Sequence, residues 1–404
     1  MKIVIFVPLE PQIYETFLFK ELAILERHKV DFHLIVSRLS PGRRQKFTIF
    51  DKYSSRFLYL PDYRSRSRFK NLRTVFSGQL KFLLSCPRLC LKTIIWLIFR
   101  FNFHWWRNYL RLSPQLLDIY RFKPDFFYSR AAGDSLISAF LSSVVFDRKF
   151  GLAYFRFRPH PALNSYLYDR IAFIMVKAGF VGQQYLEYFP QLRGKIQVIP
   201  WGIDTRFFKK ENRKRKTAVY KILACGQLLE KKGYLHLLEA CLLLKGKTAF
   251  QCLIIGNGPE QGKLTAFIED NSLEKLVRIL PPLPQKELKK RYEWADVFIQ
   301  PSVVDLSGNR DIIPNAALEA MAMELPVITT GESGLTAVIK NKQNGFIITA
   351  ADPPGTTRML ETVRKLTDQQ KKELGRKARQ TVVDGYHLNK QADKFIKLLN
   401  TFDS

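Results

Sequence analysis

Short apolar runs alternate with longer amphipathic stretches through most of the chain. The first run, Ile3 to Val7, is followed by an amphipathic pattern from Tyr14 to His28 and by a second run from Val30 to Ser37. Short apolar runs of this kind are typical of strands buried on both faces of a parallel sheet, and amphipathic stretches are typical of the covering helices. The opening of the sequence therefore predicts a strand–helix–strand unit.

The alternation is most regular in the second half of the chain. Strands and helices are expected in turn over Lys221 to Cys225, Tyr234 to Lys245, Phe250 to Ile255, Pro259 to Asn271, Val277 to Leu280, Gln285 to Trp294 and Val297 to Gln300. Strands separated by helices of this length form parallel, doubly wound sheets. The pattern predicts an α/β protein, and 404 residues suffice for two domains of about 200 residues each.

The middle of the chain is less regular. A strand is expected over Lys123 to Ser129 and a helix over Asp134 to Val145. Phe180 to Gln183 is interpreted as the strand and turn that end the first domain, and Gln391 to Phe402 as a final helix.

Composition argues against several protein classes. The first apolar run is too short for a signal peptide, and no uncharged apolar run approaches the roughly 20 residues that span a bilayer. The cysteines are odd in number and include no Cys-x2-Cys pair, which argues against a disulfide framework and a zinc site. We therefore expect reduced cysteines and a cytoplasmic protein. The cysteines are Cys86, Cys90, Cys225, Cys241 and Cys252.

Positive charge is the unusual bulk property of the chain. The formal net charge is +29, and residues 38–130 contain 20 Lys or Arg against 4 Asp or Glu. Such a concentration of cations attracts anionic surfaces, either nucleic acid or acidic lipid.

One part of this basic region is also rich in aromatic residues. Arg64-Ser65-Arg66-Ser67-Arg68 precedes it, and the stretch from Leu91 to Arg107 is apolar but interrupted by cations. Helices at a membrane interface have this composition, with Trp and Phe at headgroup depth and cations near the lipid phosphates. The alternative is an ordinary helical hairpin packed on the first sheet, and periodicity does not separate the two.

Two carboxylates are the strongest candidates for chemistry. Asp311 and Glu319 stand eight positions apart across a predicted helix start, with Pro314 where a first helical residue is favoured. Predicted strands over Ala295 to Ser302 and Pro326 to Thr330 flank this helix. The pair then lies where a strand's carboxyl end meets a helix amino end, a place suited to a phosphate. The alternative is a core helix with solvated acids at its edges.

Four motifs in order resemble those of the retaining glycosyltransferases of family 4, which have the two-domain GT-B fold. The likeness to exopolysaccharide-type members is strong from about Lys195 onward and weaker before it. Two departures stand out, since Asp311 replaces a Glu and Ile312 replaces a common Gly. The motifs are Lys195 to Phe208 at the domain junction, Cys225 to Gly233, Leu253 to Pro259, and Asn309 to Ala322.

The resemblance implies a domain plan. Two Rossmann-like, doubly wound parallel-sheet domains are expected to face a central cleft. Residues 1–200 would bind the acceptor and carry the basic aromatic insertion at about 60–120. Residues 201–385 would bind the nucleotide sugar, and residues 386–404 would form a helix that returns to the first domain.

The resemblance also implies a donor site without a metal. Asp311 and Lys232 are expected to be catalytic, with Asp311 on the transferred sugar and Lys232 on the phosphates. Glu319 would accept the ribose hydroxyls. Gln227 replaces an Arg and removes a bidentate cation. The expected donor-binding residues are Gly226, Gln227, Lys232, Gly256, Gly258, Ile313, Asn315, Leu318 and Glu319.

Acceptor residues are expected in the first domain. Glu15 and Thr16 belong to a turn that resembles the Ser-Glu-Thr-Phe turn of exopolysaccharide-type members. Arg156 and Arg158 are candidates for an acidic or phosphate-bearing acceptor. His160 is displaced from the family's position, so a loop histidine is the simpler interpretation.

Three functional hypotheses follow from these features. The first is a retaining transferase that moves a hexose-type sugar from a nucleoside-diphosphate sugar to a saccharide or lipid-linked acceptor. It would need no metal or other cofactor and would associate peripherally with an anionic membrane surface at the inner face. The second is a catalytically silent GT-B protein used for binding or scaffolding. The third, a nucleic-acid-binding protein, is disfavoured because the aromatic residues lie in apolar stretches.

Overall fold

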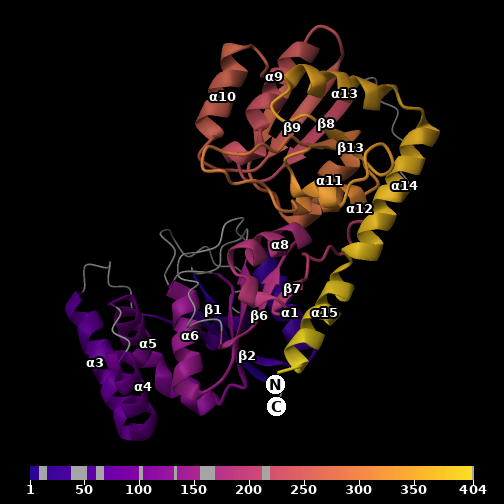
Figure 1. Ribbon diagram of the computed structural model, residues 1–404. Coiled ribbons are helices and arrows are strands. Elements are labelled where there is room, and N and C mark those ends of the chain that lie inside the picture. Colours follow the sequence, from indigo (N-terminus) through magenta and orange to yellow (C-terminus); the bar gives the residue numbers. More distant parts are fainter. Residues whose placement is uncertain are drawn as a thin grey trace. The chain divides into compact units, whose positions relative to one another are not determined.

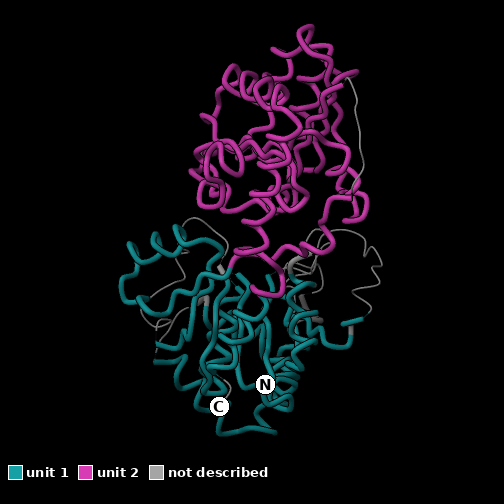
Figure 2. The backbone as a smooth tube through the Cα atoms, turned by 90° about the vertical axis from the view of Figure 1, so that its right-hand side faces the viewer, with its two compact units in different colours: residues 1–199, 392–404 teal, residues 200–391 magenta. Residues whose placement is uncertain are grey.

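The chain forms two compact units in the computed structural model (Figure 2). The structure describes residues 1–8, 16–37, 52–60, 68–99, 103–131, 134–154, 169–211 and 219–402. The first unit comprises Met1–Ile199 and Ala392–Ser404, and the second comprises Pro200–Gln391. The last segment of the chain therefore belongs to the unit that is built first in sequence.

The first unit is built on a parallel sheet of seven described strands in the order β3-β2-β1-β4-β5-β6-β7. Its central strands are apolar on both faces, as the continuous hydrophobic runs predict. The strands are β1 Lys2–Val7, β2 Asp31–Val36, β3 Phe57–Tyr59, β4 Phe126–Ser129, β5 Phe150–Tyr154, β6 Ile171–Val176 and β7 Ile196–Val198.

Helices cover both faces of this sheet (Figure 1). Alternate residues of β4 point to opposite faces. Phe127 contacts Phe146 at the end of α6, whereas Tyr128 contacts Phe395 of α15 on the other face. Phe402, just beyond α15, also stacks on Phe126 at a centroid distance of 5.3 Å. The helices are α1 Thr16–Arg27, α3 Arg68–Ser85, α4 Pro87–Phe99, α5 Phe103–Phe122, α6 Asp134–Phe146, α8 Gly179–Tyr188 and α15 Leu388–Asn400.

The basic aromatic insertion is helical. Helices α3, α4 and α5 follow one another and lie outside α6, which is buried along most of its length (Figure 1). Trp96 of α4 stacks on Trp105 of α5 at 5.1 Å between ring centroids, and both rings contact Phe140 of α6. The insertion is thus packed on the first unit through its aromatic residues.

The second unit is built on a parallel sheet of six described strands in the order β10-β9-β8-β11-β12-β13. One hydrophobic cluster joins one face of the sheet to α9, α10 and α13, and another joins the opposite face to α11, α12 and α14. The strands are β8 Tyr220–Cys225, β9 Phe250–Ile255, β10 Val277–Leu280, β11 Val297–Gln300, β12 Val327–Thr330 and β13 Phe346–Ile348. The helices are α9 Tyr234–Leu244, α10 Gln261–Asp270, α11 Gln285–Trp294, α12 Asn315–Ala322, α13 Pro353–Lys365 and α14 Asp368–Gly385.

The α/β prediction is confirmed, with one wrong element near the end of the first sheet. Phe180 to Gln183, expected as a strand and turn, lies within helix α8. The strand is β6, which begins nine residues earlier at Ile171. The short apolar run Phe180-Val181 does not form a strand because it belongs to a helical face, on which Val181 and Tyr185 are fully buried.

Two further features concern the cysteines and the lengths of the helices. All five cysteines are free, and four of them are buried. In the part of the chain that the structure describes, no helix combines the length and the apolar character needed to cross a bilayer.

Candidate functional site

The strand order of the second sheet reverses between β8 and β11, the two neighbouring strands at its centre. From β8 the strand order runs outward through β9 to β10, and from β11 it runs the other way through β12 to β13. Ligands of open parallel sheets bind beyond the carboxyl ends of the strands at such a switch point. The residues that follow Cys225 and Gln300 are therefore the first place to search for a site.

A turn after β8 carries two lysines to this edge. Lys231 and Lys232 lie in a short 3-10 helix, Glu230–Lys232, that ends at Gly233 with a φ of 65°. A Cβ at Gly233 would lie 1.9 Å from the carbonyl oxygen of Pro301, so only glycine allows this contact. The amide of Val303 also donates to the carbonyl of Lys231 at 2.9 Å. The turn is thus held against the loop that follows β11.

Asp311 lies at the centre of this arrangement and is 5% exposed. Lys232 Nζ lies 2.9 Å from its Oδ2, and Lys231 Nζ lies 3.8 Å from its Oδ1. The hydroxyl of Ser302 donates to Oδ2 at 2.7 Å. Two cations therefore surround one carboxylate, and the local balance of these three side chains is positive.

Helix α12 begins beside this cluster. The sequence predicted Pro314 as the first helical residue. In the structure the helix starts one residue later, at Asn315, and Pro314 precedes its first turn. No side chain caps its amino end. The first amides of a helix and its dipole favour an anion at such an end.

Glu319 lies one turn further along α12 and is held from the neighbouring helix. The hydroxyl of the fully buried Tyr292 donates to Glu319 Oε2 at 2.9 Å. Burial, reinforced by the Glu319 charge, raises the pKa of Tyr292 well above its ordinary value, so this hydroxyl stays a donor. Burial and the same charge raise the pKa of Cys225 to about 12. The Cys225 thiol therefore stays protonated and is a poor nucleophile.

Two glycine turns border the cluster. A Cβ at Gly226 would lie 2.9 Å from the Tyr234 hydroxyl and 3.6 Å from Lys232 Nζ. A Cβ at Gly256 would lie 1.9 Å from the carbonyl oxygen of Gly226, and a Cβ at Gly258 would lie 2.4 Å from the carbonyl oxygen of Leu228. The backbones after β8 and β9 therefore pack directly on each other.

The remaining predicted donor-binding residues differ in how far their side chains are exposed to solvent. Gln227 is exposed and Ile313 half-buried. The side chain of Leu318 is fully buried in the core of the second unit, which leaves it no surface for a ligand. Asn315 Oδ1 is buried without a hydrogen-bond partner among the described residues.

The predicted acceptor residues lie at the limit of the described structure. Glu15, Arg156, Arg158 and His160 fall outside the described residues. Thr16 begins helix α1, and only its backbone is described. Their role in acceptor binding stays a prediction.

Sequence reasoning missed Ser302, Tyr292 and Lys231. A signal existed for Ser302, because it follows the end of a predicted strand at the site edge. Lys231 adjoins the selected Lys232, but the sequence does not show which of two consecutive lysines turns inward. Tyr292 gave no signal, since an aromatic residue on a helix most often packs in the core.

Comparison with known proteins shows which proteins this chain resembles. Residues 204–381 match the family described as "Glycosyl transferases group 1". The chain is 32% identical over 191 residues to the Escherichia coli "Putative colanic acid biosynthesis glycosyltransferase WcaL", and the match covers 47% of each chain. It therefore spans about half the length of this curated relative.

Solved structures extend the likeness to both units. A glycosyltransferase from Rickettsia africae matches with a TM-score of 0.71 at 18% identity, covering 99% of this chain and 98% of the other. Anabaena Alr3699/HepE, solved in complex with UDP-glucose, matches with a TM-score of 0.70 at 13% identity, covering 99% of this chain and 100% of the other. At these identities the likeness shows the fold, which is the expected GT-B fold with two Rossmann-like parallel-sheet units. The likeness to the group 1 glycosyltransferase family model lies within the second unit.

Proposed function

We propose that this protein is a retaining glycosyltransferase of polysaccharide or glycolipid biosynthesis. It moves a hexose-type sugar from a nucleoside-diphosphate sugar to a saccharide or lipid-linked acceptor. The observation that carries the proposal is the positive cluster of Lys231, Lys232 and Asp311 beside the uncapped start of α12. This cluster lies at the switch point of a sheet whose unit matches the group 1 family model.

The cluster suits the charge that develops when the sugar leaves. A departing nucleoside diphosphate gains negative charge, and fixed cations with backbone amides stabilise that charge without a metal. Among the described residues no group of His, Cys, Asp and Glu is arranged to hold a metal ion. In our proposal Lys232 binds the diphosphate, and Asp311 orients Lys232 and contacts the transferred sugar. Glu319 accepts hydrogen bonds from the ribose.

Lys231 supplies a positive charge in place of the arginine that the family has at the position of Gln227. The sequence replaces the family's Arg by Gln227, which removes one cation from the phosphate site. Lys231 supplies a second cation on the same turn, 3.8 Å from Asp311 and next to Lys232. We propose that the two consecutive lysines together replace the Lys and Arg of the family.

The acceptor is proposed from relatives and from the basic first unit. WcaL is described as a putative colanic acid biosynthesis glycosyltransferase, so a growing saccharide on a lipid carrier is the acceptor class that we propose. Such an acceptor is presented at the inner face of a membrane, where we place the reaction.

A donor panel tests the proposal. Release of nucleoside diphosphate is measured with UDP- and GDP-sugars for the wild type, for Glu319→Ala and for the exposed control Glu269→Ala. We expect turnover with at least one donor, its loss in Glu319→Ala, and no change in the control. NMR of the product's anomeric configuration tests retention.

The same experiment separates the silent alternative, which the substitution Gln227 motivates. A rise in melting temperature with UDP or GDP, together with no release from any donor, indicates a binding protein. Neither turnover nor a thermal shift would reject both the transferase and the nucleotide site.

A further inference from the structure

Helices α3 and α4 of the first unit expose apolar side chains in two matching rows. In each helix the exposed residues are spaced i, i+4, i+7 and i+8, which places them on one face. Phe76, Leu84 and Phe99 are 73%, 75% and 83% exposed. We call these two rows the apolar stripes: Phe76, Leu80, Leu83 and Leu84 on α3, and Leu91, Ile95, Ile98 and Phe99 on α4.

The opposite face of each helix packs against the unit. The buried residues are spaced i, i+3 and i+7 on both helices, namely Val75, Gly78 and Phe82 on α3, and Cys90, Thr93 and Leu97 on α4. A Cβ at Gly78 would lie 2.4 Å from Cα of Pro114, so α3 lies directly on α5. The inner faces of α3 and α4 are thus occupied, and the stripes face away from them.

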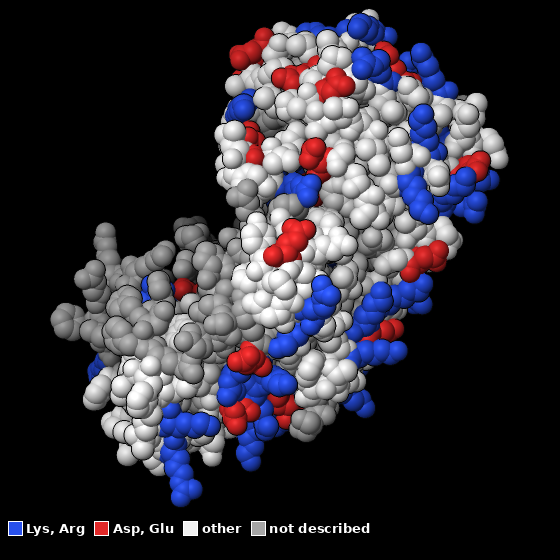
Figure 3. Space-filling model, in the orientation of Figure 1, with Lys and Arg blue, Asp and Glu red and all other residues white. Residues whose placement is uncertain are grey.

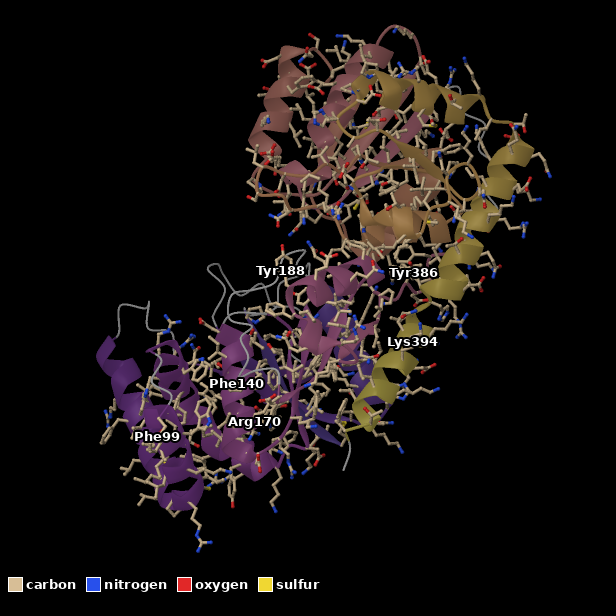
Figure 4. All side chains as sticks on the ribbon, viewed as in Figure 1. Phe99, Phe140, Arg170, Tyr188, Tyr386 and Lys394 are labelled. Atoms are coloured by element: carbon tan, nitrogen blue, oxygen red, sulfur yellow. The ribbon has the colours of Figure 1, made fainter. Side chains whose placement is uncertain are left out.

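The tryptophans do not belong to the stripes. The sequence suggested that they sit at headgroup depth, but Trp105 is buried and Trp96 stacks on it. Both contact Phe140 of α6, which Figure 4 labels between these helices and the sheet. The exposed apolar residues are therefore Leu, Ile and Phe, including Phe99 (Figure 4).

Cations accompany the stripes, and carboxylates are absent from both helices. Residues 68–99 contain no Asp or Glu. Arg73 and Arg88 each precede the first stripe residue of their helix by three positions, and Lys81 and Lys92 are also exposed. Figure 3 shows blue side chains among white ones where α3 and α4 meet.

We propose that the apolar stripes are a docking surface for an anionic lipid bilayer. Leu, Ile and Phe side chains enter the interface, while the flanking Lys and Arg contact lipid phosphates. Charge complementarity selects this occupant. A second copy of the chain, paired about a two-fold axis, would bring the same four cations against each other. Exposed apolar patches rimmed by polar residues also mark interaction sites on protein surfaces.

Vesicle sedimentation tests the surface without any donor or acceptor, so its outcome is independent of the transfer reaction. The purified protein is sedimented with phosphatidylcholine vesicles and with vesicles that also contain phosphatidylglycerol. We expect binding to the anionic vesicles only, weakened by high salt. An apolar variant and a charge variant should both bind less: Phe76→Ser/Leu84→Ser/Phe99→Ser and Lys81→Gln/Arg88→Gln/Lys92→Gln.

The charge variant needs a matched control because the whole protein is basic. The triple variant Lys365→Gln/Lys372→Gln/Arg376→Gln removes the same charge from exposed positions of α13 and α14. At about a fivefold change for each cation near an anionic surface, the α3–α4 variant, which lacks three cations, should lose on the order of 100-fold in partitioning. The control variant should retain most of its binding. Equal loss in both variants would show attraction by net charge alone and would overturn the proposal.

Insertion of the apolar residues is tested separately. Phe99→Cys, labelled with an environment-sensitive fluorophore, should shift to the blue on anionic vesicles, whereas Leu306→Cys, at a 96% exposed position of the second unit, should not. Light scattering reports the mass of the free protein. A dimer that the apolar triple variant converts to a monomer would assign the stripes to a second copy instead. Absence of vesicle binding would likewise reject the lipid surface, and capture of an acidic protein in its place would reassign the stripes.

Discussion

The two sheets have the same order in their first strands, and each places one carboxylate and two cations near its strands' carboxyl ends. In the second unit the cations Lys231 and Lys232 come from a turn, and Asp311 comes from a loop. In the first unit Glu21 belongs to helix α1, and Arg130 follows β4 directly. Arg130 Nε lies 2.8 Å from Glu21 Oε2.

The two clusters differ in how far their remaining lysine is exposed to solvent. Lys177, after β6, is 4% exposed, whereas the side chain of Lys231 is 28% exposed. Burial lowers the pKa of Lys177 to about 7, with Glu21 opposing and Arg130 adding to that shift. A similar set of charges is thus buried when its cations directly follow strand ends, and reaches solvent when a turn carries the cations. We expect the first cluster to govern stability and the second to govern turnover.

The largest expected effect is on the stability of the first unit. Arg130→Met leaves Glu21 buried without this ion partner and should lower the free energy of unfolding by about 3–5 kcal/mol. Chemical denaturation measures the change, with the exposed Arg121→Met as control. Glu21→Leu/Arg130→Met should recover part of the loss. Unchanged stability with lost turnover would mean that the first cluster binds a ligand.

The next effect concerns the second cluster. Lys232→Met removes the cation 2.9 Å from Asp311 and should lower kcat by about 10²–10³-fold, as for loss of a donor to developing negative charge. Its stability should fall less than that of Arg130→Met, because Ser302 and Lys231 still contact Asp311. The exposed Lys275→Met serves as control. A stability loss equal to that of Arg130→Met, with turnover retained, would erase the distinction between the clusters.

The buried lysine should give the first unit a pH-dependent stability. The unfolded chain binds the Lys177 proton up to its ordinary pKa of 10.5, whereas the folded unit releases it near 7. The free energy of unfolding should therefore rise with pH across this window, by up to about 1.4 kcal/mol per unit, and fall as pH drops toward 7. Lys177→Met should remove this slope. A slope that persists in the variant would assign it to other groups.

The smallest effect should come from Tyr292. Tyr292→Phe removes the hydrogen bond to Glu319 and should weaken nucleoside-diphosphate binding by about three- to tenfold. Titration calorimetry measures the dissociation constant. If α12 alone fixes the position of Glu319, the dissociation constant of the Tyr292→Phe variant will equal that of the wild type.

Sequence alone predicted the regular part of the fold because its causes are local. In the second unit each expected strand and helix from Lys221 to Gln300 is present within two residues of its predicted bounds. Strand β6 was missed and the start of helix α8 was taken for a strand because each contains a short apolar run, which periodicity does not assign to a strand or a helix. The short strand β13 likewise gave no pattern of its own.

The sequence predicted those residues of the candidate site that belong to local motifs. Asp311 and Lys232 were selected by motif, and the structure brings them to 2.9 Å. The contact from Tyr292 to Glu319 joins residues 27 positions apart on two helices, so no local pattern reports it. The inward turn of Trp96 and Trp105 escaped prediction for the same reason, because it depends on Phe140 of another helix.

The aromatic contacts of Phe395 and Phe402 bear on how the protein is made. These two side chains lie on Tyr128 and Phe126, so the core of the first unit is complete only with residues from the far end of the sequence. Domains usually fold in order as they leave the ribosome. Here the earliest-synthesised sheet must wait, with one face partly uncovered, until the second unit has been translated. A chaperone that shields nascent chains has its longest opportunity to bind during that interval.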